Sequence, residues 1–198
     1  MEVIVISHPE MLDGESTLVN ALFDEGLEIF HLRKPGVAIE AIHEFLKQIK
    51  PVYRQHIALH QYHELANEFA MKRLHFSERY RRVLNRNEFC MLGEYGYTLS
   101  TSLHDLEDIE EIRLFDYTFF GPLFKSISKP DYYNEFICSD TLSNNNKQFN
   151  LIALGGIKDD SFKYLRSLGF KGAALLGFIW QKPEEAVLQF KKIKELWK

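Results

Sequence analysis

Eight short apolar segments recur along the chain, separated by longer stretches whose apolar residues have helical spacing. The apolar segments are residues 3–6, 28–32, 56–60, 74–76, 97–102, 116–121, 151–156 and 172–177. Each has the length of a buried β-strand. Helix-like patterns lie between them and include residues 38–50, 64–71, 103–112 and 158–168. The pattern therefore predicts strands that alternate with helices.

Such an alternation is typical of a parallel sheet whose faces are covered by helices. Eight repeats within 198 residues predict a compact α/β fold, a closed (β/α)8 TIM barrel in which residues 1–198 form a single domain. A doubly wound open sheet remains the alternative, because a strand count made from one sequence is easily wrong by about one or two.

Composition narrows the class of protein. With 45% hydrophobic residues the chain can bury a sizeable core, and 24 basic against 28 acidic side chains give a charge of −4. This mild charge argues against nucleic acid or an anionic membrane as partner. The apolar start of the chain is too short for a signal peptide or a membrane span, and two cysteines are too few for a disulfide framework. We expect a soluble, cytoplasmic protein with a small-molecule partner.

Residues that follow barrel strands converge on one face, where active sites of this fold lie. Gly155 and Gly156 follow one predicted strand, and Gly177 and Phe178 follow the next. Their backbone N–H groups predict a phosphate site, since loops after the last two strands commonly bind phosphate in such barrels. Tight turns without any ligand also use glycine, so each loop alone leaves both interpretations open.

The segment GPLFKSISK at 121–129 follows the sixth predicted strand. Its hydroxyls, Ser126 and Ser128, have a spacing of two and precede Lys129. Alternation can direct both hydroxyls at one ligand, and an ordinary solvated turn has the same composition.

Three further polar residues end predicted strands. Ser102 ends the fifth strand and is a candidate substrate-binding residue or helix cap, and His104, two residues further on, is a candidate for proton transfer. A histidine packed on the barrel rim is the alternative for His104. Arg33 ends the second strand and can hold a phosphate or carboxylate through its forked donors, although a lone arginine is usually solvated.

His31, His60 and His75 end three neighbouring strands. They suggest metal ligation, but no acidic residue stands at a recognised ligand spacing beside them. We therefore predict no metal site from the sequence.

At this point the motifs resemble the thiamine phosphate synthase superfamily, which includes the TenI-type thiazole tautomerases. The similarity extends along nearly the whole chain. Its motifs are HLRKP (31–35), LHFSE (74–78), STSLHDLED (100–108), GPLFKSISK (121–129) and ALGGI (153–157). The last two are the most specific.

The resemblance implies a (β/α)8 barrel, usually a homodimer, that binds the phosphorylated hydroxyethyl-thiazole half of thiamine. It implies ligand contacts from the loop at 126–129, which matches the family's Thr-x-Thr-Lys, and a phosphate cradle at Gly155, Gly156 and Gly177. Arg33 matches the arginine that meets the diphosphate in the synthases.

Departures from the family pattern fall on the diphosphate side. The synthases are expected to hold Mg²⁺ on two aspartates, whereas this chain has His60 and Gln61 at the first position and Tyr80 at the second. Glu78 could take over as a metal ligand if the loop shifts register. The family's lysine two residues after the arginine is replaced by Pro35, and the adjacent Lys34 is expected to face another way in an extended strand.

His104 stands where the resembling tautomerases have a catalytic histidine. The resemblance therefore implies a thiazole tautomerase that moves one proton and needs no cofactor. Two alternatives remain open. One is a divergent synthase, which would require Mg²⁺, and the other is a non-catalytic barrel that binds thiazole or thiamine phosphate.

Overall fold

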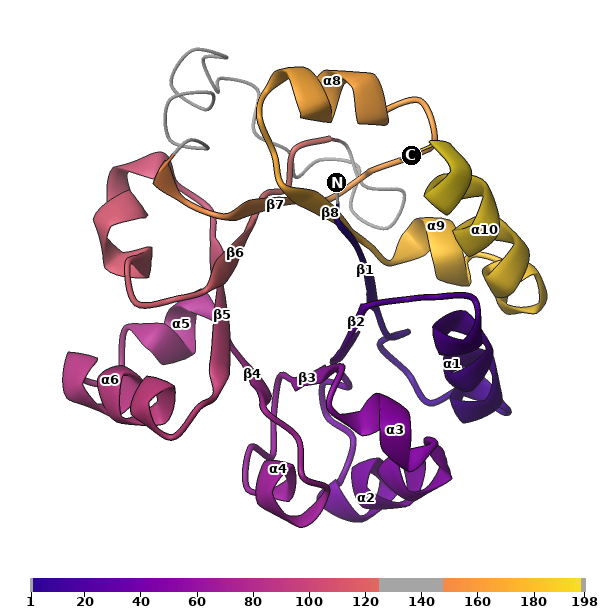
Figure 1. Ribbon diagram of the computed structural model, residues 1–198, viewed down its shortest axis with the longest axis horizontal. Helices are drawn as coiled ribbons and strands as arrows, with labels where there is room; N and C mark the ends of the chain where they lie inside the picture. Colours follow the sequence, from indigo (N-terminus) through magenta and orange to yellow (C-terminus); the bar gives the residue numbers. More distant parts are fainter. Residues whose placement is uncertain (1, 125–147, 197–198) are drawn as a thin grey trace.

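The computed structural model describes residues 2–124 and 148–196 and contains a closed barrel of eight parallel strands. Neighbouring strands in the barrel follow chain order, and β1 closes the ring by pairing with both β2 and β8. Figure 1 looks along the barrel and shows the helices as an outer ring. The prediction of a TIM barrel is confirmed, and the open sheet is excluded.

Each strand begins and ends within two residues of its predicted segment. Four of the predicted segments also included one or two residues that follow the strand. The strands are β1 (Glu2–Ile6), β2 (Ile29–Leu32), β3 (Ile57–Leu59), β4 (Arg73–Phe76), β5 (Thr98–Leu103), β6 (Tyr117–Phe120), β7 (Leu151–Leu154) and β8 (Gly172–Leu175).

The helices vary more in length than the strands. Those in the described residues are α1 (Glu15–Asp24), α2 (Ile39–Gln48), α3 (Pro51–Arg54), α4 (Leu65–Glu68), α5 (Glu78–Arg81), α6 (Arg86–Glu94), α8 (Phe162–Ser167), α9 (Gly177–Trp180) and α10 (Ala186–Leu196), with 3-10 helices η1 (Leu106–Ile112) and η2 (Pro183–Glu185). None of them is long and apolar enough to cross a membrane.

The predicted helix at 103–112 is wrong in two respects. Leu103 still belongs to β5, and the remainder forms the 3-10 helix η1 rather than an α-helix. Acidic residues crowd this segment, and pairs such as Glu107 and Glu111 would repel each other at a spacing of four on an α-helix. The predicted helix at 64–71 shortens to the single turn of α4.

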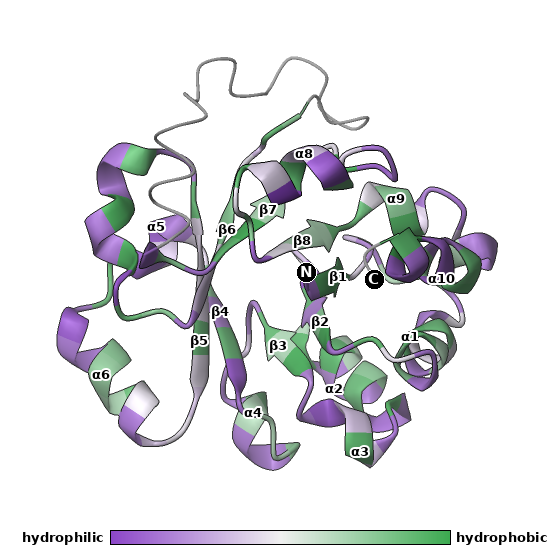
Figure 2. Cartoon of the chain, turned by 45° about the horizontal axis from the view of Figure 1, so that its top comes forward, coloured by the Kyte–Doolittle hydropathy of each residue, from purple (hydrophilic) through white to green (hydrophobic). Residues whose placement is uncertain are grey.

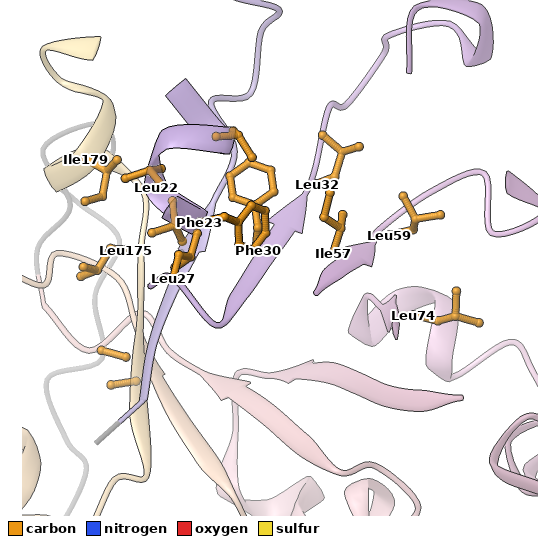
Figure 3. Packing of buried hydrophobic residues seen from close by; sticks show 14 of the residues in the cluster. Leu22, Phe23, Leu27, Phe30, Leu32, Ile57, Leu59, Leu74, Leu175 and Ile179 are labelled. Carbon is orange, nitrogen blue, oxygen red and sulfur yellow. The ribbon is translucent and has the colours of Figure 1, made fainter. Parts of the chain in front are cut away.

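Apolar side chains fill two regions. The larger one lies between the strands and the surrounding helices, and Figure 3 shows Leu22 and Phe23 of α1 beside Phe30 of β2 within it. Figure 2 shows the helices with apolar and polar sides, as this packing requires. The second cluster, on strands of the barrel, consists of Ile4, Ile6, Ile29, Tyr117, Phe119, Ile152 and Ala174.

The carboxyl ends of the parallel strands meet at one mouth of the barrel. The residues that directly follow the eight strands are Ser7, Arg33, His60, Ser77, His104, Gly121, Gly155 and Leu176. Three candidates from the sequence, Arg33, His104 and Gly155, thus come to this mouth from distant parts of the chain.

Candidate active site at the barrel mouth

His104 is paired with a carboxylate. Its imidazole Nδ1 forms a hydrogen bond with Glu78, the first residue of α5, whose other oxygen contacts Arg82 Nη2 at 2.7 Å. An ionised carboxylate only accepts hydrogen bonds, so Nδ1 carries a proton in this contact, and in the neutral imidazole Nε2 is then the basic nitrogen. The His104 side chain is 49% exposed, whereas that of Glu78 is 15% exposed. A histidine hydrogen-bonded to a carboxylate is an arrangement that can act as a general base.

Glu78 is a candidate site residue for which the sequence interpretation considered a different role. Its proposed use as a metal ligand competes with its contacts to His104 and Arg82. A carboxylate two residues after the strand next to that of the histidine is the signal that could have indicated the pair, because neighbouring strand ends lie side by side.

Ser102 faces another histidine rather than capping a helix. It lies within β5, and its Oγ is 3.1 Å from Nε2 of His75. Asp105 caps the following 3-10 helix instead, accepting a hydrogen bond from the backbone N–H of Glu107 at 3.0 Å. The prediction of a Ser102 cap is therefore wrong, because the strand continues past Ser102 before the chain turns.

Arg33 is exposed, and its backbone is anchored to the first strand end. Its N–H donates to Ser7 Oγ at 2.9 Å, and the Ser7 hydroxyl donates to the Arg33 carbonyl at 2.8 Å. The next residue, Lys34, faces away as expected. Its fully buried ammonium forms an ion pair with Glu15 of α1 and donates to the Glu10 carbonyl at 2.7 Å. Lys34 therefore ties β2 to α1, while the Arg33 guanidinium stays accessible.

The two glycine loops lie after β7 and β8, as predicted. Gly155 and Gly156 have φ angles of 96° and 64°, a region that side-chain-bearing residues rarely adopt. A Cβ on Gly155 would also come within 2.7 Å of the Pro122 ring. Gly177 is exposed, with open space around its Cα, and Phe178 beside it is half-buried. The positive φ and the contact with Pro122 require glycine at position 155. At position 177 a side chain would meet no neighbouring atom.

Ser126, Ser128 and Lys129 lie outside the described residues.

The positions at which the resemblance implies Mg²⁺ ligands do not suit that ion. Gln61 hydrogen bonds the backbone of Lys34 through both amide atoms, and the exposed Tyr80 ring stacks on Phe76 with centroids 5.9 Å apart. His60 offers an imidazole, whereas Mg²⁺ prefers hard oxygen ligands such as carboxylates. These residues do not fit a magnesium diphosphate site.

A polar cluster formed by His31, His60 and His75 lies below this mouth. His31 and His75 are buried, His60 is half-buried, and ring nitrogens of all three lie within 4.8 Å of one another. The structure thus brings together three residues for which the sequence pattern indicated no metal site.

A family model and several solved structures match this chain over most of its length. A family model described as thiamine monophosphate synthase matches residues 3–179. A crystal structure of a thiamine phosphate pyrophosphorylase from Bacteroides thetaiotaomicron is 28% identical, covers 99% of this chain and 97% of its own, and superposes with a TM-score of 0.80.

Other solved structures share the fold at lower identity. A thiamine phosphate pyrophosphorylase from Pyrococcus furiosus is 14% identical with a TM-score of 0.76, covering 99% of this chain and 95% of its own. A 3-hexulose-6-phosphate synthase is 16% identical with a TM-score of 0.65, and the match covers both chains fully. The sequence has no significant match among curated proteins.

Proposed function

Since the chain belongs to the thiamine monophosphate synthase family, we propose that it is a thiazole tautomerase that converts a carboxylated thiazole phosphate to its aromatic isomer. The observation that carries this proposal is the hydrogen-bonded pair of His104 and Glu78 at the mouth of the barrel. An acid–base pair suffices for moving one proton.

In this proposal the Nε2 atom of His104 removes one proton from a saturated ring carbon of the ligand and returns one to the exocyclic carbon that is double-bonded to the ring. The ligand's composition does not change, and its double bonds rearrange to the aromatic form. Glu78 holds the tautomer of His104 and stabilises the imidazolium that forms between the two transfers, as a buried carboxylate does for other catalytic histidines. Glu78 touches the reaction only through His104 and is a positioning residue.

The ligand is held at both ends. The Gly155, Gly156 and Gly177 loops, with the Phe178 N–H, offer backbone donors to the phosphate, which carries charge that amide dipoles favour. The exposed Arg33 guanidinium, with its backbone fixed through Ser7, pairs with the carboxylate. The resemblance adds Ser126, Ser128 and Lys129 as further ligand contacts.

A divergent thiamine phosphate synthase is the second candidate. The names of the two thiamine phosphate pyrophosphorylases with TM-scores of 0.80 and 0.76 favour it. The chemistry of His60, Gln61 and Tyr80 opposes it, because none supplies a carboxylate to Mg²⁺ and a departing diphosphate. A non-catalytic barrel that binds thiazole phosphate is the third candidate, and only turnover separates it from the first.

The test compares two reactions of one preparation. Purified protein is offered the carboxylated thiazole phosphate tautomer without added Mg²⁺, and separately hydroxyethyl-thiazole phosphate, the pyrimidine diphosphate and Mg²⁺. We expect aromatic thiazole phosphate in the first reaction and no thiamine phosphate in the second. Thiamine phosphate in the second reaction alone would establish the synthase. Binding of thiazole phosphate without turnover in either would establish the binder.

A further inference from the structure

The polar cluster of His31, His60 and His75 stands where TIM barrels usually pack branched apolar residues. The three histidines belong to β2, β3 and β4 or directly follow them, and these strands are neighbours in the barrel (Figure 1). Nδ1 of His31 lies 2.9 Å from Nε2 of His60, and the rings of His60 and His75 are stacked with centroids 3.9 Å apart. Three imidazoles thus share one small volume of the interior.

Burial of the three rings disfavours their charged form. Burial lowers the pKa of His31 and of His60 well below the ordinary value, and it lowers the pKa of His75 to about 3. Neutral imidazole is the form that binds metal ions, because the ion needs the nitrogen lone pair. One nitrogen of the 2.9 Å contact between His31 and His60 carries a proton, and this proton must move to the other nitrogen of its ring before both rings can bind an ion.

Hydroxyl groups orient two of the rings: Ser100 contacts Nδ1 of His75, and Tyr117 contacts Nε2 of His31. The Ser100 hydroxyl donates to the Leu74 carbonyl at 3.3 Å, so its oxygen accepts from Nδ1–H of His75 at 2.9 Å. The lone pair of His75 is then on Nε2, where the Ser102 hydroxyl, 3.1 Å away, must give way to an ion. The Tyr117 hydroxyl lies 2.8 Å from Nε2 of His31, on the side away from His60. Ligand histidines are usually oriented by such a partner at their other nitrogen.

The donor set selects the class of ion. Three imidazole nitrogens suit Zn²⁺, Co²⁺ or Ni²⁺ and not Mg²⁺ or Ca²⁺. The same set with one open position is typical of catalytic zinc. Arg33 and Arg73 lower the pKa of cluster members through their charge, so they would also repel a bare cation. Hydroxide or another anion in the open position would offset this repulsion.

Binding requires a small rearrangement. Nitrogens of a tetrahedral site lie about 3.3 Å apart when each is about 2.0–2.1 Å from the ion, so the His31–His60 contact must lengthen slightly. The planes of His60 and His75 differ by only 22°, and two nearly parallel rings cannot direct lone pairs at one ion. One ring must turn, and His60 is the half-buried member.

We propose that His31, His60 and His75 bind one divalent transition metal ion, of the zinc class, inside the barrel, with the open position toward the mouth. The site is independent of the proposed tautomerase reaction, which requires no metal.

The experiment titrates the intact protein, first dialysed against a chelator, with Co²⁺ and follows its visible absorption and the bound stoichiometry. We expect one Co²⁺ per chain, displaced by Zn²⁺. His31→Gln, His60→Gln and His75→Gln should each weaken binding by about 100-fold or more, since even outer partners of ligand histidines contribute about 10–100-fold. Tyr117→Phe should weaken it by about 10–100-fold.

The matched control is His43→Gln. His43 lies on α2 and contacts Glu68, so its replacement should leave Co²⁺ affinity unchanged. If a buried variant does not fold, as judged by circular dichroism, the half-buried His60→Gln decides the test. The proposal is overturned if the wild type binds no Co²⁺, or if His60→Gln and the wild type bind it equally. Neither result depends on the tautomerase assay.

Discussion

The buried ion pair of Lys34 and Glu15 connects the segment after β2 to α1, and its contribution to the free energy of unfolding can be measured. Both side chains are at most 1% exposed, and the Lys34 ammonium also donates a hydrogen bond to the Glu10 carbonyl and lies over the Phe45 ring. Glu15→Gln removes the compensating charge and leaves the ammonium buried. Breaking a buried pair in this way costs about 3–5 kcal/mol of unfolding free energy. For a chain of this size that corresponds to a fall in Tm of about 6–20 °C.

The assay is urea and thermal unfolding followed by circular dichroism. The double variant Glu15→Leu/Lys34→Met should recover most of the loss, because replacing both charges by apolar groups is often neutral or stabilising. Lys50→Met, which breaks the exposed pair with Asp24, is the control and should cost about 1 kcal/mol or less. A Glu15→Gln variant no less stable than this control would refute the argument from burial.

Three further predictions concern the site and its surroundings. Glu78→Gln should lower kcat by about 10–100-fold with little change in KM, because it disturbs the tautomer of His104 while leaving ligand contacts intact; equal kcat values would remove Glu78 from the mechanism. Gly155→Ala should cost about 1–3 kcal/mol of stability and raise KM for the phosphorylated ligand, since the new Cβ meets Pro122 at a positive φ; unchanged unfolding curves would contradict this. Stability should fall as pH decreases from about 6.5 to 5, because the unfolded chain takes up protons that folded His75, with its pKa of about 3, does not. Each such histidine contributes a slope of up to about 1.4 kcal/mol per pH unit, so urea midpoints for His75→Gln should depend less on pH than those of the wild type.

The sequence predicted the barrel well because most strands are short, nearly continuous apolar runs, although β4 and β5 carry several polar residues. β2 and β6, for example, are buried at every position and carry no polar alternation that could be mistaken for a surface element. The helices were predicted less well, since single turns such as α4 and α5 are stabilised by packing more than by their own sequence.

The site was predictable in part. Following each strand to its end brought His104, Arg33 and Gly155 to one mouth, because that inference needs only the order of elements. The pairing of Glu78 with His104 and the contact between His31 and His60 required the lateral register of neighbouring strands. No single-strand pattern contains that register, so these contacts were not predicted.

In the proposed thiazole tautomerase, His104 transfers the proton. The most direct measurement is the rate at which the carboxylated thiazole phosphate tautomer becomes aromatic, compared between the wild type and His104→Gln without added Mg²⁺. We predict turnover by the wild type and a loss of about 10²–10⁴-fold in the variant, the range typical of a removed general acid–base group. Equal rates for the two proteins, or no conversion by the wild type, would contradict the account.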